Sequence, residues 1–148
     1  MREARLAFGF SEQLVPWVAE RIQHLRSPDF GPCETIGIVR GDRLIAAAIY
    51  HDYIAAHEIA QFTIASESPL WATKGVISGL LHYAFRQMNV YTLYTLTLPS
   101  NERALKVNEH IGLKRKTIIP HAFGRKRHAV LCQMTEPEYS KRYEVNHG

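Results

Sequence analysis

The fold of this chain is decided by the stretch Leu98-Pro99-Ser100-Asn101-Glu102-Arg103-Ala104-Leu105-Lys106-Val107-Asn108-Glu109-His110-Ile111-Gly112-Leu113. A β-rich run ends at Pro99, and Asn101 then supplies a side-chain oxygen that can cap a helix. Apolar residues follow at helical spacing, and Gly112 stands where a helix often ends in the left-handed conformation. The stretch therefore predicts a strand over residues 90–98, a capped helix and a glycine stop in succession.

Length and composition indicate one domain of ordinary size. The 148 residues, 46% of them hydrophobic, can bury a core without metals or disulfides. Cys33 and Cys132 fit neither a disulfide framework nor paired zinc ligands, and the histidines lack a ligand spacing, so we expect reduced cysteines and no metal. The net charge of +4 suits an anionic ligand, nucleic acid or an acidic protein without choosing among them.

The sequence contains no pattern typical of a membrane span or a secretory signal. No apolar run approaches the roughly 18 residues needed to span a bilayer, and Arg2, Glu3 and Arg5 do not resemble the start of a secretory signal. We therefore expect a cytoplasmic protein with no membrane partner. Residues 1–135 are expected to form the domain, and residues 136–148 a polar C-terminal tail.

The rest of the chain predicts a regular alternation of elements. Pro16 suits the first turn of a helix, and residues 51–56 suit a polar loop. Helices are expected over residues 15–25 and 73–88, and strands over residues 5–8, 35–40, 43–50, 58–65, 114–119 and 127–134. The order is strand, helix, three strands, helix, strand, helix and two strands.

This order and the opening stretch resemble the GNAT superfamily of acyl-coenzyme A-dependent N-acyltransferases. The chain keeps the superfamily's residues at Asn101, Ala104, Glu109 and Gly112, but Asn108 stands where the superfamily usually has tyrosine. The resemblance implies an α/β (α+β) fold, with a central mixed, mostly antiparallel sheet of about six or seven strands flanked by helices. It also implies acetyl-CoA as cofactor and a primary amine, on a protein or a small molecule, as acceptor.

Several local patterns are similar to those of small phage and prophage GNAT-like proteins. They are Trp17, Phe30-Gly31-Pro32, Ile64-Ala65-Ser66 and Trp71-Ala72-Thr73-Lys74-Gly75. A phage-encoded member would act in the host cytoplasm.

The resemblance also implies a cofactor site. The pyrophosphate would accept hydrogen bonds from backbone N–H groups at the start of the long helix. Such binding needs no particular side chain, and Lys74 adds a positive charge there. Of the superfamily's three defining positions in this loop, only Gly75 is kept; the alternative is that Thr73 caps the helix and Gly75 serves packing. The strand over residues 58–65 would separate from its neighbour and align the pantetheine. The implied cofactor-binding residues are Phe62, Thr63, Ile64, Ala65, Trp71, Ala72, Thr73, Lys74, Gly75, Val76, Asn101, Arg103 and Asn108.

The catalytic base has two candidates. Glu58 comes first, because members of the superfamily often carry an acid early on this strand, where water can relay the proton of a bound amine. Alternation places Glu58 on the strand face of Phe62, and His57 on the face of Gln61. If the second face meets the cleft, His57 becomes the base. Asn108 cannot act as an acid at neutral pH, but its amide can donate a hydrogen bond to a leaving thiolate.

A second function remains open beside the enzyme. The degenerate phosphate loop and Asn108 favour a catalytically inactive GNAT-fold interaction module that binds a host or virion protein. Its contact surface would be the basic clusters at residues 114–116 and 125–127, which a hairpin of the last two strands would bring together. No nucleic-acid-binding motif accompanies them, so nucleic acid is not the partner we expect. In the superfamily these strands often pair in a homodimer, and the loops near residues 26–34 and 51–56 help to select the acceptor.

Overall fold

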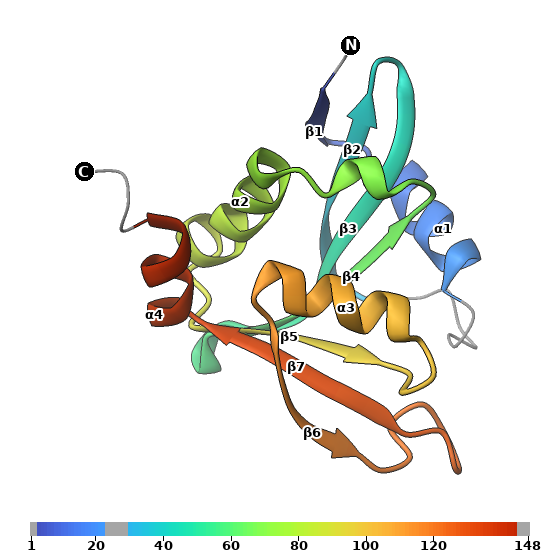
Figure 1. Ribbon diagram of the computed structural model, residues 1–148, viewed down its shortest axis with the longest axis vertical. Helices are drawn as coiled ribbons and strands as arrows, with labels where there is room; N and C mark the ends of the chain where they lie inside the picture. Colours follow the sequence, from blue (N-terminus) through green and yellow to red (C-terminus); the bar gives the residue numbers. More distant parts are fainter. Residues whose placement is uncertain (1–2, 23–29, 145–148) are drawn as a thin grey trace.

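The computed structural model of the protein describes residues 3–22 and 30–144. Its elements in chain order are β1 (Ala4–Phe8), α1 (Ser11–Arg21), β2 (Cys33–Arg40), β3 (Arg43–Ile54), β4 (Ile59–Ser66), α2 (Lys74–His82), β5 (Thr92–Thr97), α3 (Glu102–Ile111), β6 (Lys114–Ile119), β7 (Ala129–Thr135) and α4 (Glu136–Tyr139) (Figure 1). Helices α2 and α4 each continue into a π-helical turn, and 3-10 turns precede β4 and α2.

The seven strands form one sheet in the order β1-β2-β3-β4-β5-β7-β6. Every neighbouring pair is antiparallel except β4 and β5, which run parallel. A parallel pair needs a long crossover, and α2 with its flanking turns provides it. The predicted mixed, mostly antiparallel sheet flanked by helices is confirmed.

Two hydrophobic layers hold the helices on the sheet. Helix α1 covers one face through Leu14 and Val18, which pack on Ala47, Ile49 and Ala65. The buried residues of α2, α3 and α4 form the larger core on the other face, together with inward-facing residues of β2 to β5 and β7. The sheet is therefore covered by α1 on one side and by the other three helices on the opposite side.

The pairing of β4 with β5 is short. Only three registered pairs join the strands, from Ile59 with Thr92 to Gln61 with Tyr94. Beyond Gln61 the two strands diverge toward their C-terminal ends (Figure 1). This divergence opens the middle of the sheet.

The opening stretch folds as predicted. Asn101 accepts a hydrogen bond from the Ala104 N–H to its Oδ1 at 3.2 Å and so caps α3. Gly112 ends the helix at φ 112°, where its N–H and that of Leu113 both reach the Asn108 carbonyl. Strand β6 has the predicted bounds.

Three predicted segments differ from the structure. Helix α1 begins at Ser11, so Pro16 lies inside the helix rather than in its first turn. Strand β3 continues through His51 to Ile54, because these polar residues extend the ladder with β4 instead of forming a loop. The long helix predicted over residues 73–88 changes from α to π geometry at Tyr83. The predictions for residues 23–29 lie outside the described residues.

The segment after Thr135 also departs from the predicted polar tail. Tyr139 of α4 is 2% exposed and stacks on Phe85 with ring centroids 4.8 Å apart. Arg86 forms ion pairs with Glu136 and Glu144. The chain up to residue 144 therefore packs as part of the domain.

The basic clusters do not meet as predicted. Strands β6 and β7 form the expected hairpin, but Lys114 lies opposite Gln133 while residues 125–127 belong to the turn at the other end. Lys114 also pairs with Glu138, and Arg115 with Glu109, each at 2.8 Å. The length of β6 separates the clusters, and part of their charge is balanced.

Candidate active site

A cleft of about 230 Å³ lies where β4 and β5 diverge. Strand β4 lines it with residues 62–66, and β5 with residues 95–97. The remaining lining residues are Arg21 and Ile22 from the α1 side, and Trp71, Asn101, Arg103, Ala104, Val107 and Asn108 from the opposite side. Eight of the predicted cofactor-binding residues thus gather around one opening: Phe62, Thr63, Ile64, Ala65, Trp71, Asn101, Arg103 and Asn108.

The exposed edge of β4 gives this cleft its chemical character. Within the described part of the chain, the ladder between β4 and β5 ends at Gln61, while the opposite edge of β4 stays paired with β3 up to Ser66. Backbone N–H and C=O groups on the β5 side are therefore available to a ligand. An extended chain with amide groups can pair with such an edge as a further strand would.

Asn108 lies between α3 and β5, and is 4% exposed. Its Nδ2 donates to Thr95 Oγ1 at 3.1 Å and to Thr97 Oγ1 at 3.3 Å. Both amide hydrogens are therefore directed at β5. A hydrogen bond from this amide to a leaving thiolate, as we predicted, needs the side chain to turn away from the threonines.

The same polar cluster borders a cysteine. Burial raises the pKa of the Cys132 thiol, although hydrogen bonds from Thr95 and Asn108 act in the opposite direction. Since a thiolate is the reactive form, Cys132 is not activated as a nucleophile.

The predicted phosphate loop lies at the start of α2. Thr73 caps the helix by accepting the Val76 N–H on its Oγ1 at 3.2 Å. The N–H groups of Lys74 and Gly75, the first two positions of the helix, have no hydrogen-bond partner among residues 3–22 and 30–144. A Cβ added to Gly75 would meet nothing within 4 Å, so packing does not require this glycine. Gly75 therefore leaves open space in front of these two N–H groups.

Not all predicted cofactor residues share the main cleft. Thr73, Gly75 and Val76 line a second hollow, of about 310 Å³, together with residues 3–6. Ala72 and Lys74 line neither cavity. The predicted set therefore divides between the β4–β5 cleft and the N-terminal end of α2.

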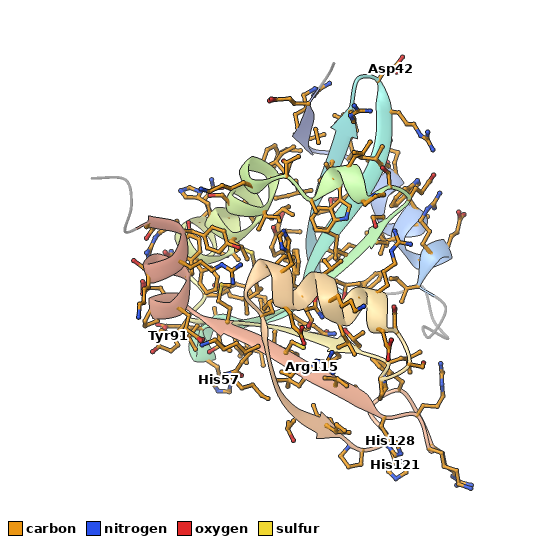
Figure 2. The ribbon with its side chains drawn as sticks, in the orientation of Figure 1. Asp42, His57, Tyr91, Arg115, His121 and His128 are labelled. Atoms are coloured by element: carbon orange, nitrogen blue, oxygen red, sulfur yellow. The ribbon has the colours of Figure 1, made fainter. Side chains whose placement is uncertain are left out.

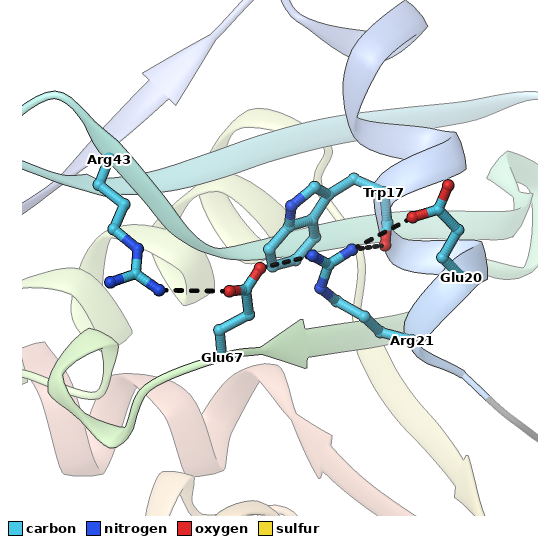
Figure 3. A network of polar contacts seen from close by, with 5 residues as sticks. All are labelled: Trp17, Glu20, Arg21, Arg43 and Glu67. Carbon is cyan, nitrogen blue, oxygen red and sulfur yellow. Dashed lines mark hydrogen bonds and ion pairs between the residues drawn. The ribbon is translucent and has the colours of Figure 1, made fainter.

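One rim of the cleft is an ion-pair network (Figure 3). Arg21 Nη2 lies 2.5 Å from Glu67 Oε1, and its guanidinium is 3.7 Å from the centroid of the Trp17 ring. Arg43 contacts the other carboxylate oxygen of Glu67 at 3.4 Å. The hydrogen bond from Arg21 is the main reason that the pKa of Glu67 is lowered. The network joins the end of α1 to the end of β4.

The two predicted bases lie elsewhere. Glu58 is not on β4 but follows a 3-10 turn, with φ 54°, and its carbonyl accepts the N–H groups of Tyr91 and Thr92. His57 belongs to that turn and lies beside Tyr91 (Figure 2). Both side chains are exposed at the end of β4 that pairs with β5, away from the cleft. The predicted alternation placed them on a strand, whereas the left-handed Glu58 interrupts it.

Sequence reasoning missed Thr95, Thr97 and Arg21 as cleft residues. The threonines carried a detectable signal, because they occupy the inward-facing, alternate positions of a buried strand. Polar groups at such positions need partners, and Asn108 is one of them. Arg21 gave no such signal, since its place depends on how α1 crosses the sheet.

The described residues offer neither a metal site nor a membrane-spanning helix. Within residues 3–22 and 30–144, no three His, Cys, Asp or Glu side chains are grouped so as to hold a metal ion. Over the same ranges, no helix combines the length and apolar character that crossing a membrane requires.

Known proteins were compared with the chain. No protein-family model matches the sequence. No curated protein matches it either. A chimera of the spermidine N-acetyltransferase SpeG from Vibrio cholerae and hSSAT matches the structure with TM-score 0.77 at 14% identity, over 95% of this chain and 99% of that one.

Further SpeG structures agree. A mutant of the Vibrio cholerae enzyme matches with TM-score 0.75 at 16% identity, over 96% of this chain and 99% of that one. The Vibrio cholerae spermidine N-acetyltransferase in complex with CoA and spermine matches with TM-score 0.69 at 15% identity, over 93% of this chain and 98% of that one. These matches give no support to the narrower phage subset. With the strand order and the open β4–β5 pair, they show that the chain has the GNAT fold.

Proposed function

We propose that the protein transfers an acetyl group from acetyl-CoA to a primary amine. The observation that carries this proposal is the divergence of β4 from β5, which leaves the edge of β4 open along residues 62–66 in a cleft. The similarity to spermidine N-acetyltransferases supports it at the level of the fold. The amine acceptor is a small molecule or a protein side chain.

The residues present fit the two ends of acetyl-CoA. The pantetheine, with its amide groups, would pair with the free edge of β4. The pyrophosphate would accept the N–H groups of Lys74 and Gly75, aided by the helix dipole and the Lys74 ammonium group. Asn101 and Arg103 also line the β4–β5 cleft, where their polar groups could contact the cofactor.

The bound cofactor would supply an acetyl thioester, whose carbonyl carbon forms a bond to the amine nitrogen while its bond to sulfur breaks. The protein must hold the two reactants together and help the sulfur to leave. Thr97 lines the cleft, and its oxygen already accepts from Asn108. Its hydroxyl hydrogen is then the donor that this chain offers to the departing thiolate.

Calorimetry with CoA and acetyl-CoA tests cofactor binding. A transfer assay then presents acetyl-CoA with spermidine, a lysine peptide, a free N-terminal peptide and an aminoglycoside. We expect binding in the micromolar range and acetylation of at least one amine. Absence of binding at millimolar concentration contradicts the proposal.

The alternative is a GNAT-fold interaction module without catalysis. It is favoured by Asn108, which is not an acid and has both amide hydrogens directed at β5. CoA binding without transfer to any amine would support this alternative.

A further inference from the structure

Three side chains on β3 and β4 form a hydrogen-bonded line. His51 Nε2 lies 2.7 Å from Thr63 Oγ1, and His51 Nδ1 lies 2.7 Å from Asp52 Oδ2. The His51 side chain is 7% exposed, whereas that of Asp52 is 61% exposed. The order is hydroxyl, imidazole and carboxylate, and the residue that carries the hydroxyl, Thr63, lines the cleft.

The partners fix where the protons lie. An ionised carboxylate only accepts hydrogen bonds, so the Nδ1 atom of neutral His51 carries the hydrogen. Its Nε2 atom then has a lone pair and accepts the Thr63 O–H. Among the described residues no side chain donates to Thr63 Oγ1, so its lone pairs can accept a hydrogen from a group in the cleft.

The side chains of the line lie on the α1 side of the sheet. Thr63 pairs in register with Ile49, whose side chain belongs to the layer under α1. The α2 and α3 sides carry the groups assigned to the cofactor. The ring of Phe30 lies edge-on to His51, with centroids 5.1 Å apart. An amine approaching from the α1 side would meet the Thr63 hydroxyl, with His51 behind it.

We propose that Thr63 and His51 relay a proton from the acceptor amine, with Asp52 holding the imidazole in place. This inference rests on the proposed function. Thr63 is the catalytic residue, because it touches the acceptor, and His51 is a positioning residue that acts through it. The relay takes the role for which Glu58 and His57 were considered.

The proton balance is complete. The acceptor enters as R–NH₃⁺ and gives one proton to Thr63 Oγ1, while the Thr63 hydroxyl proton passes to His51 Nε2. The freed nitrogen lone pair forms the bond to the acetyl carbonyl carbon, and the carbon–sulfur bond breaks. A second nitrogen proton goes to the departing sulfur, and His51 returns its proton to water.

The protonation of His51 sets the pH range. Burial lowers the pKa of His51, against the opposing hydrogen bond and charge of Asp52, so the imidazole is neutral at pH 7. Three titratable groups face it among the described residues: Asp52, Cys33 directly opposite on β2, and Tyr94 on β5 beside Gln61. Burial, and secondarily the charge of Asp52, raises the pKa of Tyr94, so it stays neutral in this range.

The test uses the full chain and the best acceptor of the panel. The wild-type protein accepts the amine in its ammonium form. Its kcat/KM is therefore expected to be independent of pH between the pKa of His51 and the pKa of the amine, which is about 10. Thr63→Val and His51→Gln need the free amine, so their kcat/KM is about 100-fold lower at pH 7 and rises about tenfold per pH unit. Thr63→Ser restores the level profile. In wild type, kcat/KM falls at low pH as His51 becomes protonated. Asp52→Asn is expected to move this fall to lower pH, because it removes the group that raises the pKa of His51.

Two controls separate the relay from structural damage. Thr35→Val removes another buried threonine hydroxyl, bonded to Ser11 Oγ at 2.6 Å, and is expected to keep the wild-type pH profile. Calorimetry with CoA is expected to give the same affinity for His51→Gln and wild type, because His51 does not line the cleft. A Thr63→Val profile that stays level, or an acetyl group found on Thr63 by mass spectrometry, overturns the relay.

Imidazole NMR distinguishes failure of the relay from failure of the proposed function. Nitrogen-15 spectra of His51 are expected to show hydrogen on Nδ1 and a bare Nε2 at pH 7. The opposite tautomer overturns the relay even if the wild type acetylates an amine. Absence of wild-type turnover contradicts the proposed function, and the relay with it.

Discussion

Asn108 of α3 donates a hydrogen bond from its Nδ2 to Thr95 Oγ1 of β5, at 3.1 Å, inside the main core. A second hydrogen bond joins the same nitrogen to Thr97. The amide thus donates to the hydroxyl oxygens of two β5 threonines that border the cleft. Asn108 therefore has a structural role, because it joins α3 to β5 through two hydrogen bonds.

Replacing Asn108 by leucine is expected to destabilise the protein by about 2–4 kcal/mol, because buried polar groups lose their partner. Urea unfolding measures the change. Lys106→Ala on the exposed side of the same helix serves as control and is expected to stay within about 0.5 kcal/mol of wild type. An Asn108→Leu protein as stable as the control would show that the hydrogen bonds contribute nothing.

Gly75→Glu is expected to affect stability and ligand binding in opposite directions. The new side chain has open space and stands in the first turn of α2, where a carboxylate stabilises a helix by about 0.3–1 kcal/mol. The same charge repels a pyrophosphate, so the affinity for CoA is expected to fall at least about tenfold. Thermal unfolding and calorimetry measure the two effects.

Gly75→Ala is the matched control, because it adds a Cβ without charge. We expect it to be at least as stable as wild type and to bind CoA more tightly than Gly75→Glu. Equal CoA affinity for wild type, Gly75→Ala and Gly75→Glu would show that the start of α2 does not bind the cofactor.

Glu58→Gly is expected to raise stability by up to about 1 kcal/mol, because glycine adopts the left-handed conformation at φ 54° without steric cost. Its turnover is expected to match wild type, since the side chain lies outside the cleft. Chemical unfolding and the transfer assay check both statements. A loss of about 100-fold in kcat would instead identify Glu58 as the base and contradict the Thr63–His51 relay.

Glu138 links α4 to β6 and β7. Its carboxylate is hydrogen-bonded to Lys114, which is the main reason its pKa is lowered to about 2, and to the N–H and hydroxyl of Thr135. A lowered pKa in the folded state stabilises the protein above the unfolded value of 4.5, and this contribution is lost as the pH falls toward 2.

Glu138→Gln is therefore expected to lower the free energy of unfolding at pH 7 by about 0.5–2 kcal/mol, the range for a helix cap. The difference from wild type is expected to shrink between pH 4.5 and 2. Urea unfolding across this range measures it, and a pH-independent difference would show that the carboxylate charge is not involved.

Local signals accounted for the elements that the sequence predicted well. Asn101 and Gly112 act through hydrogen bonds within a few residues, so their roles are readable from the chain. Pro16 and His51 were misplaced because local preference was outweighed by packing of α1 and by the extended β3 ladder. The left-handed Glu58 gave no sequence signal, since glutamate seldom adopts this conformation.

The candidate site was predictable where it follows one strand or helix. Residues 62–65 and Asn101 were placed in the cleft by resemblance, and they line it. The contact of His51 with Thr63 was not predictable, because it depends on the register between β3 and β4. The partners of Asn108 likewise lie on another element.

We propose above that the open edge of β4 holds acetyl-CoA. A crystal structure of the protein with CoA bound tests it most directly. We expect the pantetheine to pair with the backbone of residues 62–66, and the pyrophosphate to accept the N–H groups of Lys74 and Gly75. Crystals grown with millimolar CoA whose β4–β5 cleft contains no pantetheine would contradict it.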